Sequence, residues 1–218
     1  MRGRRADVLH RLLLGLAGII LALPVAAQEQ TDLRDFRVGE PVRSLPSSGY
    51  IGFACADAPG EKLSGWAEYA KCPRDATGLH AVGFRYDPVA NPMGRINDSY
   101  EGTRVAGQPV LLALLISDNG VVDGIRIATD PQARLYLRKK AFLFGLQVRA
   151  RYGEDGWHCR QDPPAAGEEP VGGVFIKEHC DKVAGTRHLV VDRELYRRTD
   201  QKLKDFVGGS QVLILLAG

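Results

Sequence analysis

Long apolar runs and familiar chemical motifs are scarce in this sequence. The longest apolar stretch is the 14 residues from Leu12 to Val25, fewer than the roughly 20 that a helix needs to cross a bilayer. The chain has no G-x-S-x-G elbow, no H-E-x-x-H, no EF-hand loop and no C-x-x-C pair. These absences argue against a serine hydrolase of the α/β class, a zinc protease and a zinc finger. We therefore predict no cofactor and no metal site.

Net charge is also missing from most of the chain. The first 27 residues carry four of the 29 basic residues and one of the 26 acidic residues, so residues 28–218 hold 25 of each. Electrostatic binding of nucleic acid requires a basic excess or a concentrated basic patch. We therefore expect no nucleic-acid partner.

The N-terminus has the three-part pattern of a secretory signal peptide. Arg2, Arg4, Arg5 and Arg11 precede the apolar stretch, and Val25-Ala26-Ala27 places small residues at positions −3 and −1 of a cleavage site. We expect cleavage after Ala27, no transmembrane span in the mature chain, and a periplasmic or extracellular protein. The pair Arg4-Arg5 leaves both the general and the twin-arginine export routes open.

The four cysteines lie in the predicted mature region, at positions 55, 72, 159 and 180. An even number of cysteines in an exported chain favours disulfides, because that compartment permits oxidation. Four cysteines allow three pairings, and their number alone does not choose among them.

Similar segments occur in the same order in the two halves of the chain. Gly52–Cys55 resembles Gly156–Cys159, and Val105–Leu112 resembles Val207–Ile214. Seven residues separate the second cysteine of each half from a histidine, His80 or His188. We interpret these matches as an internal duplication. A duplication predicts the local disulfides Cys55–Cys72 and Cys159–Cys180.

The periodicity predicts an α+β fold, mainly antiparallel β, in which one helix lies between two duplicated, disulfide-stapled strand modules. We expect strands at 63–72, 79–87 and 109–116, and a turn at Asp118-Asn119-Gly120 that closes a hairpin. Alternating apolar residues at 146–152 predict a strand after the helix. The predicted parts are a lead-in at 28–47, a first β module with the hairpin at 48–128, a helix at 129–145, and a second β module at 146–218.

The run from Val110 to Tyr152 resembles the C-terminal domain of TonB-type energy transducers. The residues that carry the resemblance are Asp118–Val122, Ile125-Arg126 and Ala141. It covers 43 of the 191 predicted mature residues and implies only a strand–turn–strand–helix–strand arrangement. The membrane helix and Pro-rich linker of that family do not accompany it, so no function is carried over.

Two groups of residues are candidate sites. Arg134, Arg138, Lys139 and Lys140 form an acid-free basic stretch on the predicted helix, which is either a solvated face or a surface for an acidic partner or anionic lipid. His80 and His188 occupy equivalent positions in the proposed duplication. They are either a paired site for a metal or a proton, or two residues at strand entrances beside the disulfides.

These observations predict an exported, non-catalytic binding protein of the cell envelope, such as an adaptor, an assembly factor or an enzyme inhibitor. Its expected partner is another envelope protein or a small ligand, met on sheet edges or on the loops 88–104 and 160–170. The alternative is an envelope hydrolase with a site between the two modules around His80 and His188.

Overall fold

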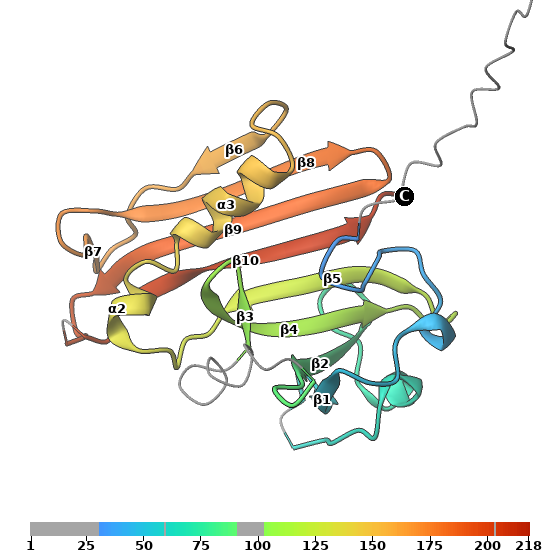
Figure 1. The fold of residues 1–218 in the computed structure, drawn as a ribbon. Coiled ribbons are helices and arrows are strands. Elements are labelled where there is room, and N and C mark those ends of the chain that lie inside the picture. Colours follow the sequence, from blue (N-terminus) through green and yellow to red (C-terminus); the bar gives the residue numbers. More distant parts are fainter. Residues whose placement is uncertain (1–30, 59, 91–102, 203) are drawn as a thin grey trace, which may run out of the picture. The chain divides into compact units, whose positions relative to one another are not determined.

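The computed structural model describes residues 31–58, 60–90, 103–202 and 204–218 (Figure 1). The predicted signal peptide and most of the loop 88–104 lie outside the described residues. Thr31–Gly218 form one unit by their internal contacts. None of the helices among the described residues is long and apolar enough to cross a membrane.

Most of the regular structure is strand. The strands are β1 (Tyr50–Cys55), β2 (His80–Tyr86), β3 (Arg104–Val105), β4 (Gln108–Ile116), β5 (Val122–Thr129), β6 (His158–Gln161), β7 (Glu168–Glu169), β8 (Ile176–Ala184), β9 (Arg187–Arg198) and β10 (Val207–Leu216). The helices are α2 (Leu135–Arg138) and α3 (Leu143–Arg151), with 3-10 turns η1 (Val42–Ser44) and η2 (Trp66–Lys71).

The strands form one sheet in the order β1-β2-β4-β5-β10-β9-β8-β6, to which β3 and β7 add short pairings with β4 and β9. Every strand pair in the described part of the chain is antiparallel. The structure is 44% strand and 13% helix, which confirms the prediction of a mainly antiparallel β protein. The predicted hairpin is also confirmed, because β4 and β5 pair on either side of the Asp118–Gly120 turn.

The two predicted strand modules are not separate bodies. β5 pairs with β10 from Gln211↔Ala128 to Leu215↔Gly124, and this pairing makes one sheet of the strands from both halves. The order β1-β2-β4-β5 on one side and β6-β8-β9-β10 on the other places the first strand of each half at an outer edge. The duplication itself stays a prediction.

One face of this sheet is covered from β2 to β9. The register Phe84↔Leu112↔Ile127↔Val212↔Val191 places these buried side chains on the same face. On the second half α3 covers this face, and its Gly145 approaches Val191. On the first half residues 31–48 and η2 cover it (Figure 1).

The segment predicted as an extended lead-in contributes to the core. Phe36 is fully buried, with ring centroids 4.7 Å from Tyr50, 5.4 Å from Trp66 and 5.1 Å from Phe84. The Trp66 indole N–H donates to the Pro46 carbonyl at 3.0 Å. These contacts fix residues 31–48 against β1 and β2.

Trp66 also explains why residues 63–72 do not form the predicted strand. The chain turns into η2, which buries the indole among the aromatic rings and returns Cys72 to Cys55 on β1. A straight strand from 63 to 72 would carry Cys72 away from that partner, since a strand rises about 3.3 Å per residue. The strand prediction is wrong at this point.

The helical region differs from the prediction in both bounds and length. The predicted helix at 129–145 is replaced by the single turn α2, and α3 runs through Gly145 to Arg151, so the strand predicted at 146–152 is wrong. Gly145 does not end the helix. Its amide donates to Ser210 Oγ at 3.1 Å, and the missing side chain lets α3 lie directly on β9.

Gly145→Ala is expected to destabilise the protein. A Cβ at this position would lie 2.6 Å from Arg193 Cγ and 2.8 Å from Val191 Cγ1. Overpacking of this kind costs about 1–3 kcal/mol, which exceeds the roughly 1 kcal/mol that alanine gains in a helix. We expect a lower urea midpoint with an unchanged slope. The matched control is Gly65→Ala, whose Cβ meets nothing within 4 Å; equal midpoints for the two variants would contradict this account.

Candidate functional site

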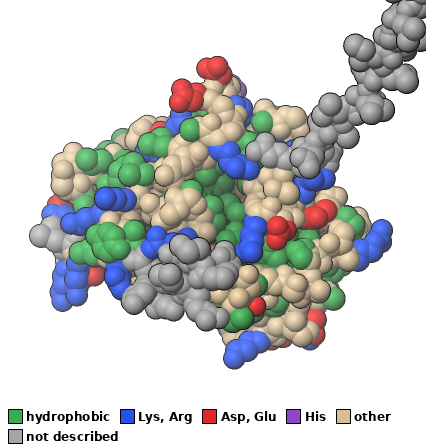
Figure 2. Space-filling view, viewed as in Figure 1, with side chains coloured by type: hydrophobic (Ala, Val, Ile, Leu, Met, Phe, Trp, Pro, Cys, Tyr) green, Lys and Arg blue, Asp and Glu red, His purple; other side chains and the backbone are tan. Residues whose placement is uncertain are grey.

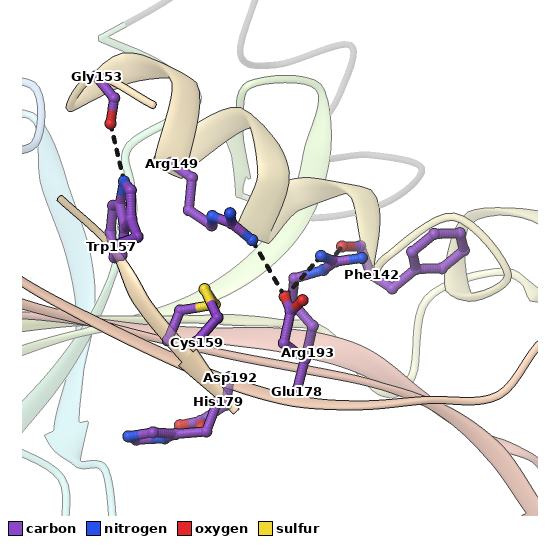
Figure 3. The surroundings of a disulfide bond; sticks show 10 residues. Phe142, Arg149, Gly153, Trp157, Cys159, Glu178, His179, Asp192 and Arg193 are labelled. Carbon is purple, nitrogen blue, oxygen red and sulfur yellow. Dashed lines mark hydrogen bonds and ion pairs between the residues drawn. A yellow bond between two sulfur atoms is a disulfide. The ribbon is translucent and has the colours of Figure 1, made fainter. Parts of the chain in front are cut away.

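An ion-pair network holds α3 on the sheet. The Arg193 side chain, on β9, is buried beneath the helix, where its Nε donates to the Phe142 carbonyl at 3.0 Å and its Nη1 to Glu178 at 2.7 Å (Figure 3). Arg149 on α3 reaches the same Glu178 oxygen at 3.4 Å. One carboxylate on β8 therefore serves two guanidinium groups.

Sequence reasoning missed this network, although one signal was present. Arg193 stands in phase with Leu189, Val191 and Leu195, which are all buried on one face of β9. A charged residue in the buried phase of a strand needs a partner, because an unpaired buried charge is costly. The phase alone therefore indicated a buried ion pair, and the fold supplies Glu178 from the neighbouring strand.

Both predicted disulfide pairings are confirmed. Cys55 on β1 is bonded to Cys72, and Cys159 on β6 is bonded to Cys180 on β8. Cys159, Glu178 and Cys180 form the one group of metal-ligand side chains within 4.8 Å of one another among the described residues. The two cysteines carry no thiolate while they share a disulfide, so this group is not a metal site.

The solvent-facing side of α3 carries two exposed leucine side chains, Leu143 and Leu146. The exposed residues of α3 are Leu143, Leu146, Gln147, Ala150 and Arg151, so its outer ridge is largely aliphatic. A surface helix normally presents polar residues to solvent. Leu143 and Leu146 are 38% and 40% exposed, so both contribute apolar surface to the outer side of α3.

The four basic residues of the predicted partner surface lie next to this ridge. Arg134, Lys139 and Lys140 are exposed. Arg138 is half-buried, where its Nη2 donates to the Phe206 carbonyl at 2.9 Å and its guanidinium lies 5.0 Å from the Phe206 ring centroid. Leu135 and Tyr136 are exposed between them, at 41% and 54%. In the space-filling view, basic and apolar side chains adjoin over α2 and α3 (Figure 2).

We call this surface the helical face and define it by seven exposed side chains from α2, α3 and the adjoining residues. They are Arg134, Leu135, Tyr136, Lys139, Lys140, Leu143 and Leu146. Arg138 adjoins it.

A cleft of about 340 Å³ lies beside α2, where β5 ends and β10 continues. It is lined by Thr129, Pro131, Arg138, Asp192, Glu194 and residues 206–211. Gly208 and Gly209 form part of its wall. A Cβ on Gly209 would lie 2.9 Å from Thr129 Oγ1, and one on Gly208 would lie 2.7 Å from the Phe206 ring. Close packing within the chain therefore explains both glycines.

Two polar side chains that line the cleft, Ser210 and Asp192, are hydrogen-bonded to other parts of the chain. Ser210 Oγ donates to the Ala141 carbonyl at 2.9 Å and accepts from the Gly145 amide, which leaves no free nucleophile on this buried hydroxyl. Asp192 accepts from His179 Nδ1 at 2.7 Å. Burial raises the pKa of Glu194, an effect that Lys177 opposes and Asp192 reinforces.

His80 lies in a network beside the first disulfide. Its Nδ1 lies 2.6 Å from the Cys72 carbonyl oxygen and its Nε2 lies 3.0 Å from Asp118 Oδ1. Arg74 also donates to Asp118. Hydrogen bonds from His80 and then Arg74 lower the pKa of the Asp118 carboxyl. Since both ring nitrogens of His80 face acceptors, the histidine ties the β4–β5 turn to Cys72.

His188 does not join His80, so the structure does not assemble the predicted paired site. His80 stands in phase with Val82, which the register Val82↔Leu114↔Ile125↔Ile214↔Leu189 places on the covered face. His188, adjacent to Leu189, points to the opposite face, and its Nε2 lies 3.9 Å from Asp181. Neighbouring side chains along a strand point to opposite faces, so equivalent positions in the proposed repeat do not have to share a face.

Glu178→Gln is expected to lower the free energy of unfolding by about 3 kcal/mol, because it leaves Arg193 buried without a counter-charge. The measurement is urea unfolding near neutral pH with the disulfides intact. Asp162→Asn is the matched control, since it removes one carboxylate from the exposed Arg160–Asp162 pair and is expected to cost less than about 1 kcal/mol. A Glu178→Gln variant as stable as this control would show that Arg193 needs no charged partner.

The chain matches no family model, no curated protein and no solved structure.

Proposed function

We propose that residues 28–218 form an exported, non-catalytic binding protein of the cell envelope that meets its partner through the helical face. The roles that fit such a protein are adaptor, assembly factor and enzyme inhibitor. The observation that carries the proposal is the exposure of Leu135, Tyr136, Leu143 and Leu146 beside basic residues on one helical segment.

Two features support export. The N-terminal pattern is that of a cleaved signal peptide, and the described residues contain two disulfides, which persist in oxidising compartments. Each disulfide closes a short loop, 17 residues in the first half and 21 in the second. Loops of this length contribute about 3 kcal/mol to stability in the chain-entropy model.

A binding role is favoured over hydrolysis by the state of the polar side chains. Both ring nitrogens of His80 and the hydroxyl of Ser210 are engaged in internal hydrogen bonds. A general base must instead lie within reach of a proton on a substrate or nucleophile. The engagement of His80 and Ser210 within the chain is therefore the observation that favours the binding role over the hydrolase alternative around His80 and His188.

Export predicts a mature chain that starts at Gln28 and contains no free thiol. The measurement is the intact mass of protein recovered from the periplasm or the medium, before and after reduction. Reduction is expected to add two hydrogen atoms for each disulfide, and peptide mapping to recover Cys55–Cys72 and Cys159–Cys180. An unprocessed N-terminus in the recovered protein would contradict cleavage after Ala27.

The binding surface is tested by site-specific photo-crosslinking in the producing cells. A photoreactive residue at Leu146 is expected to give a discrete adduct with an envelope component, and Lys139→Gln with Lys140→Gln to weaken it. The control position is Val183, which is 66% exposed on the opposite face of the sheet. Equal labelling at both positions, or labelling at Leu146 that is unchanged by the Lys139 and Lys140 substitutions, would overturn the assignment of the helical face as the binding surface.

A further inference from the structure

The helical region concentrates positive charge, although residues 28–218 as a whole carry equal numbers of basic and acidic residues. From Pro131 to Gly153 there are six basic residues and no acidic residue. Glu178 pairs with Arg149 and Arg193, and Arg151 donates to the Thr31 carbonyl. Arg134, Lys139 and Lys140 are exposed on the helical face.

Exposed apolar and basic side chains follow one another along the segment that carries this face. Arg134 precedes Leu135 and Tyr136, and Lys139 and Lys140 precede Leu143 and Leu146. A protein–protein interface usually has an apolar centre depleted of charge and a polar rim. At a membrane surface, leucine and aromatic side chains can enter the headgroup boundary while the stems of neighbouring lysine and arginine residues extend to the phosphates.

A second copy of the chain is a poor occupant for the same surface. A twofold contact places the same patch of each subunit against itself, so Lys139 and Lys140 would face their own equivalents. Juxtaposed like charges oppose such a contact. The charge on the face therefore calls for an anionic occupant.

From these observations we infer that the helical face docks on an anionic phospholipid surface. Leu143 and Leu146 insert at the headgroup boundary, with Leu135 and Tyr136 beside them, and Arg134, Lys139 and Lys140 bind lipid phosphates. This inference rests on the proposed function and names the partner of that surface. Binding through it would leave the opposite face of the sheet exposed.

The inference predicts binding of the oxidised mature protein to vesicles of equimolar phosphatidylglycerol and phosphatidylcholine, and little binding to phosphatidylcholine alone. Added salt weakens the binding, because exposed charges are screened. Each cation near an anionic surface contributes about fivefold in affinity. Lys139→Gln with Lys140→Gln is therefore expected to weaken binding about 25-fold. Co-sedimentation measures the partition.

Two matched controls distinguish binding through this surface from non-specific effects of charge and hydrophobicity. Lys62→Gln with Lys71→Gln removes the same charge from exposed lysines of the first half and is expected to leave binding unchanged. Leu143→Ser with Leu146→Ser is expected to weaken binding, whereas Val183→Ser on the opposite face is not. Circular dichroism and the urea midpoint establish that every variant is folded.

Equal binding to neutral and anionic vesicles, or equal loss in the two lysine variants, would overturn the lipid inference. The crosslinking experiment distinguishes this failure from failure of the proposed function. A protein adduct at Leu146 that depends on Lys139 and Lys140, without vesicle binding, would show that the face binds an acidic protein. Absence of both vesicle binding and a specific adduct would reject the binding surface itself.

Discussion

The backbone pairing of β5 with β10 is the interaction on which the rest of the structure depends. It joins strands from the two halves into one sheet, in register from Gln211↔Ala128 to Leu215↔Gly124. Ile125 and Ile214 stand opposite each other in this ladder, and both are almost fully buried. Because one face is then continuous from β2 to β9, one large core spans both halves beneath residues 31–48, η2 and α3, with a small second cluster of Ile176, Leu195 and Phe206. A larger core buries a larger share of its surface, which favours the joined arrangement.

The covering helix is fixed by two close contacts that leave its other side exposed. Gly145 brings the backbone of α3 against Val191, and Arg193 reaches the Phe142 carbonyl while it pairs with Glu178. These contacts define which ridge of α3 faces the sheet, so they also define that Leu143 and Leu146 face outward. The buried ion pair and the proposed docking surface are therefore two sides of one helix orientation.

Local chemistry predicted several elements well. The Asp118–Gly120 turn and the alternation along β5 depend on neighbours in sequence, and the hairpin is confirmed. Both disulfides, which were predicted from the similarity of the two halves, are confirmed as well. The errors lie where long-range contacts outweigh local preference. Helix propensity predicts a helix end at Gly145, and the period-two pattern predicts a strand at 146–152. Packing against β9 and β10 instead makes residues 143–151 the helix α3.

The sequence by itself determined the mainly antiparallel fold and the basic character of residues 134–140, because each follows from residue type and short-range spacing. The two local disulfides were predicted from the similarity of the two halves of the sequence. Only the tertiary structure decided which side chains share a surface. Strand register sends His80 and His188 to opposite faces, and the same register brings Glu178 to Arg193. The seating of α3 turns an ordinary basic stretch into part of a mixed apolar and basic face. These outcomes depend on contacts between residues distant in sequence, which no local pattern encodes.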